Sequence, residues 1–380
     1  MQYIVFGKPL INSKQKKEVL NTLNSGWIGS GPKVQILEEK FKKYKKIKYS
    51  SAVNSCTAAL HLSLNALNLN KNDEVIVPAM TFCSTVNAII HSGAKPVLAD
   101  VDYKTGNITA ESITKKITKR TKAIVVVHLA GNPCEMDSIL KIVKMNNLFL
   151  IEDCAHAIEG KYKGRELGTF GNFGCFSFYV TKNLTTAEGG MIISNNQKRI
   201  NKIKVSALHG LSKDAWSRFS DKGYKHYQVT ELGFKYNMTD LQASLGIDQI
   251  DNIEKLWSRR KKIWEFYYNE LSNLKLEITP KSPEYCKNSY HLFQLKVFKK
   301  KSGISRDELI NKLHKKNIGT GVHYLSIPSH KFYKEKFNWK NNDYPNASLI
   351  GNRTLSLPLS PYLKNNEINY IADQIKRILR

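Results

Sequence analysis

Apolar residues follow two alternating patterns between about residues 12 and 250. Continuous apolar runs, which are typical of strands buried on both faces, occupy 123–128 and 148–153. Between them, the apolar positions of 136–146 are three or four residues apart, as on one face of a helix. The alternation of buried strands with amphipathic helices predicts an α/β fold whose large, mostly parallel sheet is flanked by helices.

Other segments of this region continue the pattern. Strands are predicted at 74–78, 96–101, 175–179 and 191–194, and helices at 57–67 and 84–91, with helical spacing also at Leu20, Leu23, Val34, Leu37 and Phe41. Ligands of such sheets bind beyond the carboxyl ends of the strands. Asp153 and Lys182 both follow strand-like runs, so we expect them to lie where ligands bind.

A second, smaller unit is expected after the sheet region. The apolar spacing of 239–271 predicts one long helix between two parts of the chain, a large domain of residues 1–250 and a small domain of residues 251–380. The remainder contains predicted strands at 292–298 and 318–323 and predicted helices at 306–316 and 367–379. This mixture is typical of a small α+β domain.

The chain is strongly basic, which changes the range of partners to consider. Its net charge is +27, from 59 lysine and arginine residues against 32 aspartate and glutamate residues. The basic residues lie in short scattered clusters, lysine is far commoner than arginine, and no helix-turn-helix, zinc-finger or RNA-binding motif accompanies them. We therefore expect a solvated basic surface that attracts anionic substrates, and no nucleic-acid partner.

The cysteines and the apolar runs bear on the location of the protein. None of the six cysteines belongs to a C-x-x-C pair, and several lie within apolar runs, which predicts buried free thiols in a reducing compartment. The first 31 residues lack the pattern of a signal peptide, and the longest apolar runs are far shorter than a membrane span. These features predict a soluble, cytoplasmic protein without a membrane partner.

Lys182 and Asp153 together point to one kind of chemistry. They lie 29 positions apart, in the stretches FYVTKNLTT and LFLIEDCAHA. Enzymes that use pyridoxal phosphate need an amine that forms a Schiff base with the cofactor aldehyde and a carboxylate that keeps the pyridine nitrogen protonated. If the two residues form such a pair, the chain is an enzyme of this class.

Segments along nearly the whole chain extend this hypothesis to a family. They include GWIGSGPKVQILEEKF, NSCTAALHLSL, VPAMTFCSTVNAI, HLAGNPCEMDSI, the run from EDCAHAIEG to AEGGMI, ELGFKYNMTDLQASLG, TGVHYLSIPSH and LSLPLSPYL. In this order they resemble the DegT/DnrJ/EryC1/StrS family of pyridoxal-phosphate-dependent sugar aminotransferases, which have the fold of type I transferases. The resemblance implies that Lys182 is the Schiff-base lysine and that Asp153 pairs with the pyridine nitrogen. Dehydratase relatives carry histidine at the position of Lys182, so the lysine argues for transamination.

The resemblance also assigns further cofactor contacts. It places His156 at the phenolic oxygen, Thr57, Ala58 and Ser177 at the phosphate, and Phe82 against the ring. Amides at a helix start and nearby hydroxyl groups are suited to a phosphate, whereas an isolated phenylalanine is more often a core residue. The spacing of the histidines suggests no metal site.

Two further blocks concern the substrate and a second subunit. Asn237, in GFKYNMTD, is the residue expected to reach the phosphate site of a partner subunit, with Lys235 as the alternative. The resemblance thus implies a homodimer with shared active sites. His323 and Tyr324 are expected on the substrate side of the cleft.

The resemblance implies L-glutamate as the amino donor and a nucleotide-linked keto sugar as the acceptor, with the cofactor alternating between pyridoxal and pyridoxamine phosphate. The form TKNLTTAEGG is similar to that of relatives that aminate C4, whereas relatives that aminate C3 often have GKNLG; Ala187 replaces a frequent glycine. We therefore expect a 4-keto-6-deoxy sugar nucleotide to become a 4-amino-4,6-dideoxy sugar nucleotide for a surface glycan. Amination at C3, a cofactor-binding regulator without turnover, and a nucleic-acid-binding protein stay open as alternatives.

Overall fold

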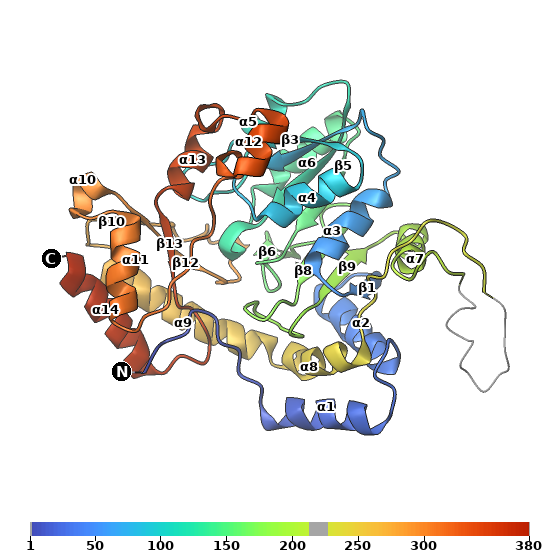
Figure 1. Cartoon of the computed structure of the whole chain (residues 1–380), viewed down its shortest axis with the longest axis horizontal. Coiled ribbons are helices and arrows are strands. Elements are labelled where there is room, and N and C mark those ends of the chain that lie inside the picture. The colour runs from blue at the N-terminus through green and yellow to red at the C-terminus, as the bar shows by residue number, and fades with distance from the viewer. Residues whose placement is uncertain (1, 213–226, 380) are drawn as a thin grey trace.

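The computed structural model describes residues 2–212 and 227–379. Figure 1 shows a larger part, in which strands lie between helices, beside a smaller part that holds both ends of the described chain. The helix α9 (Ile253–Leu271) runs from the larger part into the smaller one (Figure 1).

Most of the predicted elements are confirmed, with ends that differ by one or two residues. The other helices are α1 (Ser13–Asn24), α2 (Pro32–Lys45), α3 (Cys56–Asn65), α4 (Cys83–His91), α5 (Ala110–Thr114), α6 (Met136–Met145), α7 (Gln197–Ser206), α8 (Asp240–Asp251), α10 (Lys299–Ser302), α11 (Arg306–Lys315), α12 (Lys331–Phe337), α13 (Pro345–Gly351) and α14 (Asn365–Leu379). The strands are β1 (Tyr49–Val53), β2 (Glu74–Pro78), β3 (Lys95–Ala99), β4 (Thr121–Val127), β5 (Phe149–Asp153), β6 (Lys161–Tyr162), β7 (Arg165–Glu166), β8 (Phe173–Ser177), β9 (Gly190–Ser194), β10 (Leu276–Ile278), β11 (Cys286–Lys287), β12 (Phe293–Val297) and β13 (Thr354–Leu357).

The large sheet has seven strands in the order β1-β9-β8-β5-β4-β2-β3. Strand β9 is antiparallel to both of its neighbours, β1 and β8, and the other neighbouring pairs are parallel. The prediction of a mostly parallel sheet is therefore confirmed. Its parallel strands end at one edge, which gathers the residues that follow β4, β5 and β8.

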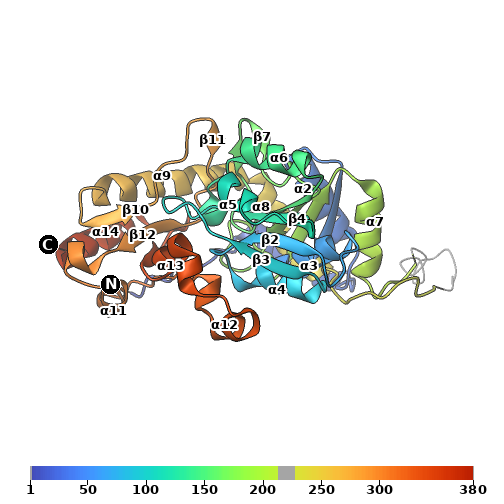
Figure 2. The same ribbon diagram turned by 90° about the horizontal axis from the view of Figure 1, so that it is seen from above.

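Helices cover both faces of this sheet, which explains the continuous apolar runs of its strands. In β4, Val125 belongs to an apolar core shared with α3, α4 and α7, whereas its neighbours Ile124 and Val126 belong to a core shared with α2, α6 and α8. Figure 2 shows α6 on one side of β2 and β3 and α4 on the other. Burial on both faces makes the sheet a rigid support for the loops at its edge.

The smaller part has its own apolar core around the antiparallel sheet β10-β12-β13. This core includes Trp264 of α9, Phe293 of β12 and Ile371 of α14, together with Ile4 near the N-terminus. However, α12 and α13 contribute to a core of the large sheet, as the hydrogen bond from Tyr333 to Asn87 illustrates. The division of the chain at residue 250 stays a prediction.

The predicted strand at 318–323 is wrong. Ile318 and Gly321 form isolated β-bridges to two different segments, to Ile4 and to Ser356. The segment is thus shared between the N-terminal residues and β13, and it cannot pair along its length with either. Sequence alone does not reveal this competition, because the bridging partners lie at opposite ends of the chain.

The predicted long helix at 239–271 is divided into α8 and α9 at Asn252. The backbone of Asn252 leaves the helical region, with φ −104° and ψ 3°. Its side-chain amide donates to the carbonyl of Asp248, one turn earlier, and so replaces the helical hydrogen bonds that are lost there. The connection between the two parts of the molecule is therefore α9 rather than one continuous helix.

The six cysteines are free thiols, as predicted. Four of them are buried, while Cys83 and Cys286 are half-buried. Across residues 2–212 and 227–379, no helix combines the length and the apolar character that crossing a bilayer requires.

Candidate active site

A cavity of about 550 Å³ opens at the edge of the sheet where the parallel strands end. Val127 ends β4, Asp153 ends β5 and Ser177 ends β8, and all three side chains line it. The starts of two helices complete the floor, with Thr57 in α3 and Phe82 before α4. This is the position that a parallel sheet offers to a ligand.

The cavity brings together eight of the residues that sequence reasoning selected. They are Thr57, Phe82, Asp153, His156, Ser177, Lys182, His323 and Tyr324. Ala58 and Asn237 are not among its lining residues. Since the amine of Lys182 and the carboxylate of Asp153 border one space, the pairing proposed from sequence is geometrically feasible.

Asp153 is a buried carboxylate held by two neutral donors. Its Oδ1 accepts from the amide of Ala155 at 3.1 Å, and its Oδ2 accepts from the hydroxyl of Thr85 at 2.9 Å. Burial raises the pKa of Asp153 above its usual value, and these hydrogen bonds oppose the rise. Asp153 forms no ion pair with any described residue, although the charge of Lys182 acts on it from nearby and also opposes the rise in pKa. A protonated ring nitrogen of a bound cofactor fits this unpaired acid.

Lys182 lies in the loop between β8 and β9. The loop turns sharply before it, because the amide of Lys182 donates to the carbonyl of Tyr179 at 2.9 Å. Burial lowers the pKa of the Lys182 amine from 10.5 to about 8, while the nearby Cys56 and Asp153 act in the opposite direction. About a tenth of this amine is therefore uncharged at pH 7, far more than for an ordinary lysine, and this is the form that a nucleophile and proton carrier requires.

The hydrogen bonds of His156 determine which of its nitrogens carries the proton. Its Nδ1 accepts from the amide of Ala130 at 3.2 Å, so the proton of the neutral ring is on Nε2. That Nε2 donates to the hydroxyl oxygen of Tyr324 at 2.9 Å. Burial holds the pKa of His156 well below its usual value, and the charge of Lys182 adds to this effect. His156 thus presents a neutral N–H donor at the cavity.

The start of α3 is suited to an anion, although one of its amides is already used. The hydroxyl of Ser55 caps the helix by accepting from the amide of Ala58 at 3.0 Å. Thr57 and, from β8, Ser177 line the cavity with hydroxyl groups. A phosphate at this position would contact Thr57 and Ser177 directly, and it would compete with Ser55 for the amide of Ala58.

The two residues considered for a partner subunit differ in their surroundings. Asn237 donates from Nδ2 to the hydroxyl of Ser30 at 2.6 Å, and its buried Oδ1 has no hydrogen-bond partner in the described structure. Lys235 is exposed, and its carbonyl accepts from the side chain of Asn54. Whether either residue reaches a second active site stays a prediction.

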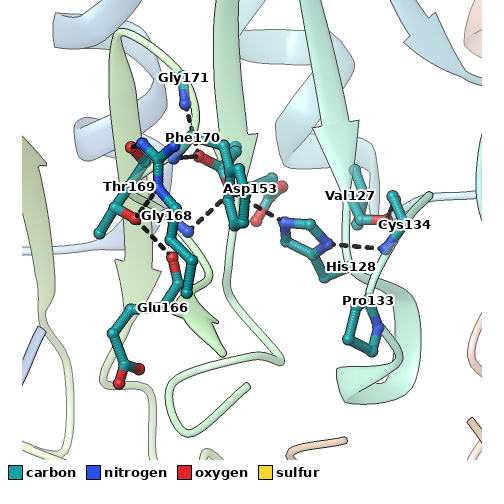
Figure 3. Close-up of polar contacts among 12 residues, drawn as sticks. Val127, His128, Pro133, Cys134, Asp153, Glu166, Gly168, Thr169, Phe170 and Gly171 are labelled. Atoms are coloured by element: carbon teal, nitrogen blue, oxygen red, sulfur yellow. Dashed lines mark hydrogen bonds and ion pairs between the residues drawn. The ribbon is translucent and has the colours of Figure 1, made fainter. Parts of the chain in front are cut away.

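A buried polar cluster lies behind Asp153. The side chain of Glu152 accepts from the amides of Gly168, Phe170 and Gly171 at 2.7–2.8 Å, and its Oε2 lies 3.2 Å from Nε2 of His128. Figure 3 shows the converging amides and the continuation from His128 to Cys134. These bonds fix the loop that follows β7 against the end of β5.

Two side chains of this cluster, His128 and Glu152, lie close to the side chain of Cys154. These three form the one group, among the described residues, whose spacing would suit a metal ion. The Nδ1 of His128 accepts from the amide of Cys134 at 3.1 Å, so Nε2 carries a proton and donates to Glu152. The lone pairs with which His128 and Glu152 would bind a metal are thus engaged in hydrogen bonds, which favours a structural role for these two side chains.

Sequence reasoning missed several residues of the cavity wall. Phe6, Tyr179, Glu188 and His291 line it in addition to the predicted residues. His291 directly precedes a predicted strand, but this strand is distant from β5 in the sequence. No local pattern therefore indicates that His291 lies near the end of β5. Phe6 reaches the cavity because the N-terminal segment packs against the small part, where its ring stacks on His323.

Comparison with known proteins agrees with this geometry. Residues 9–376 match the DegT/DnrJ/EryC1/StrS aminotransferase family. The spore coat polysaccharide biosynthesis protein SpsC of Bacillus subtilis is 42% identical over 379 residues, which cover 100% of this chain and 97% of SpsC.

Solved structures agree in fold along the whole chain. The PMP-form of the putative sugar aminotransferase Spr1654 from Streptococcus pneumoniae has a TM-score of 0.92 and 33% identity, and the match covers 99% of this chain and 98% of Spr1654. Its PLP-form has the same TM-score at 32% identity. Helicobacter pylori PseC, an aminotransferase involved in the biosynthesis of pseudoaminic acid, has a TM-score of 0.91 and 28% identity, with 100% of this chain and 99% of PseC covered.

Proposed function

The chain belongs to the DegT/DnrJ/EryC1/StrS aminotransferase family, and we propose that it transfers the amino group of L-glutamate to a nucleotide-linked 4-keto-6-deoxy sugar. It is a pyridoxal-phosphate-dependent sugar aminotransferase that acts in sugar or polysaccharide biosynthesis. The proposed product is a 4-amino-4,6-dideoxy sugar nucleotide for a surface glycan. The acceptor class rests on the form of the loop around Lys182, TKNLTTAEGG.

One observation carries the proposed roles of the site residues: Lys182 and Asp153 border the same cavity at the edge of the sheet. Bound pyridoxal phosphate supplies an aldehyde that reacts with amines and a ring that accepts electrons. Asp153 would hold the proton on the ring nitrogen, and its lack of an ion-pair partner in the described structure supports this role. His156 would donate its Nε2 proton to the phenolic oxygen in place of the hydroxyl of Tyr324, since Nε2 is its protonated nitrogen.

The central proton transfer is assigned to Lys182. With the cofactor and the amino donor bound, the free amine of Lys182 would move a proton from the α-carbon of the donor to the C4′ carbon of the cofactor. The lowered pKa of Lys182, about 8, supports this exchange, because both protonation states are accessible near neutral pH. Thr57 and Ser177, which line the same cavity, would bind the phosphate of the cofactor.

We propose a homodimer in which Asn237 reaches the phosphate site of the partner. Exposed apolar side chains gather on α1, on α2 and between them, which supports an interaction surface there. They are Leu20, Leu23, Trp27, Ile28 and Ile36. The spacing of Leu20 and Leu23 predicts the helix correctly, but their side chains are 57% and 47% exposed instead of facing a core of the same chain.

A substrate screen tests the proposal. The purified holoenzyme is incubated with L-glutamate and with UDP-, GDP- or dTDP-linked sugars that carry the keto group at C4 or at C3, and the amino sugar nucleotides are identified by mass. We expect turnover with a 4-keto acceptor. If only 3-keto acceptors are converted, the position of amination is C3 and not C4. If 2-oxoglutarate is released but no keto sugar nucleotide is converted, the acceptor is not a sugar nucleotide.

A further inference from the structure

His291 is a cavity residue to which neither the reaction nor the resemblance assigns a role. It lies two residues before the start of β12, it is 7% exposed, and it lines the same cavity as Lys182. Its ring lies beside that of His156, with the ring centroids 4.4 Å apart and the planes inclined by 30°. Two neutral imidazoles therefore meet at one wall of the site.

The residue that follows Lys182 fixes one nitrogen of His291. The Nδ2 of Asn183 donates to the carboxylate of Glu159 at 2.9 Å and to the carbonyl of Ser289 at 3.1 Å. Both partners can only accept, so the amide of Asn183 has one possible orientation, with Oδ1 toward His291. That oxygen lies 2.9 Å from Nδ1 of His291.

A buried ion pair reinforces the orientation of this amide. Glu159 is fully buried and accepts from Nη2 of Arg260, which is itself 1% exposed. A carboxylate only accepts hydrogen bonds, so Asn183 cannot turn over without losing its two hydrogen bonds to Glu159 and Ser289. The chain of contacts from Arg260 through Glu159 and Asn183 ends at His291.

These contacts decide the polarity that His291 presents to the cavity. Because Oδ1 of Asn183 only accepts, Nδ1 of His291 carries the proton, and the Nε2 of the neutral ring carries a lone pair. Burial keeps the ring neutral by holding the pKa of His291 well below its usual value. This Nε2 has no hydrogen-bond partner among the described residues, yet it is not sealed off from solvent. Since His291 lines the cavity, we infer that Nε2 faces it.

The two adjacent rings thus have opposite polarity toward the cavity. His156 has its proton on Nε2, whereas His291 has its lone pair there. A lone pair suits a hydroxyl group, which can donate, and it repels a carboxylate, which can only accept. Of the two proposed substrates, the keto sugar has hydroxyl groups, whereas the carboxylates of glutamate offer no donor, and its one donor group, the amine, is the group that reacts with the cofactor.

We propose that His291 is a specificity-determining residue whose Nε2 accepts a hydrogen bond from a hydroxyl group of the acceptor sugar, and that Asn183 is the positioning residue that fixes its tautomer. The inference rests on the proposed function, since it needs a hydroxylated acceptor. A site that hydrogen-bonds a substrate hydroxyl rejects the analogue that lacks it, because the buried polar group is then left unpaired. His291 would therefore act in the second half-reaction and not in the first.

Kinetics of the separate half-reactions test this inference. His291→Phe keeps a planar ring but removes the lone pair, and the matched control His314→Phe changes a histidine of α11 outside the cavity. For His291→Phe we expect the rate with L-glutamate to stay within about two-fold of the wild type, while kcat/KM for the keto sugar nucleotide falls about 10- to 100-fold, mainly through KM. An equal loss in both half-reactions would overturn the inference.

Substrate analogues keep the test valid even if the variant is less stable. Keto sugar nucleotides that lack one hydroxyl at a time are compared with the parent sugar within each enzyme. For one of these deoxy analogues, we expect kcat/KM of the wild type to be about 10-fold or more below that for the parent sugar. In His291→Phe, the same analogue should react about as well as the parent. The same penalty in both enzymes for every analogue would overturn the inference.

The tautomer itself can be observed without turnover. In the holoenzyme with ¹⁵N-labelled histidine, nitrogen–proton correlation spectra should show the proton of His291 on Nδ1, and Asn183→Leu should abolish this preference. A proton on Nε2 in the wild type would contradict the geometry. If the wild type reacts with glutamate but with no keto sugar nucleotide, the proposed function fails and this inference fails with it.

Discussion

Tyr324 places its hydroxyl 2.9 Å from Nε2 of His156, although the two residues are 168 positions apart. His156 follows a strand of the large sheet, whereas Tyr324 comes from the C-terminal third of the chain. The contact joins the two parts of the molecule at the cavity wall. Because Nδ1 of His156 is already an acceptor, Nε2 is the donor of this bond, and a cofactor oxygen that accepts from His156 would have to displace Tyr324 or share the proton with it.

The lowered pKa of Lys182 predicts the pH dependence of cofactor capture. Only the uncharged amine reacts with an aldehyde, and a lowered pKa makes this form available at lower pH. The rate at which the apoprotein captures pyridoxal phosphate should therefore rise with pH and level off above about 8. Stopped-flow absorbance measures this rate, with Nα-acetyl-lysine as the reference. A rate that keeps rising toward pH 10.5 would show that burial does not lower this pKa.

Mixed dimers test whether Asn237 acts across a subunit interface. Lys182→Ala and Asn237→Ala should each be inactive or strongly impaired as homodimers. When both chains are expressed together, one site of each mixed dimer has an intact Lys182 and receives an intact Asn237, so activity should reappear. Lys235→Ala, the control for the alternative residue, should retain activity. If mixing restores nothing, Asn237 acts within its own subunit or not at all.

The Glu152 cluster should contribute strongly to stability. Glu152→Gln keeps the size of the side chain but replaces one carboxylate oxygen by an NH2 group, so that either Gly168 and His128 or Phe170 and Gly171 lose their acceptor. We expect the free energy of unfolding to fall by about 2–4 kcal/mol, as measured by urea denaturation of the holoenzyme. The control Glu111→Gln removes an exposed carboxylate that pairs with Lys115, and it should leave the unfolding midpoint unchanged. Equal stability of both variants would contradict the structural role of the cluster.

The sequence predicted the large sheet and its edge well. The runs that became β4, β5 and β8 are apolar throughout because both of their faces are covered, and this pattern is local. It follows that Asp153 and Ser177, which end two of these strands, had to lie at the same edge. Lys182 was placed with them because only a short loop separates it from β8.

Other parts of the site depend on contacts between distant segments, which no local pattern records. His291 reaches His156 only through the packing of the two parts of the molecule, and the orientation of Asn183 depends on a buried ion pair from α9. The failed strand at 318–323 has the same origin, because its single bridges go to opposite ends of the chain. At Ala187, φ is +67°, a conformation that favours glycine, which is the residue that the resemblance leads one to expect there.

Covalent mapping of the cofactor tests the central claim most directly. The holoenzyme is reduced with borohydride, digested and analysed by mass spectrometry, together with Lys182→Ala and with Lys141→Ala, which changes an exposed lysine of α6. The account predicts the added mass of the reduced cofactor on the peptide that contains Lys182 in the wild type and in Lys141→Ala, and none in Lys182→Ala, which still binds the cofactor without turnover. Stable attachment to a different lysine, or full activity of Lys182→Ala, would contradict it.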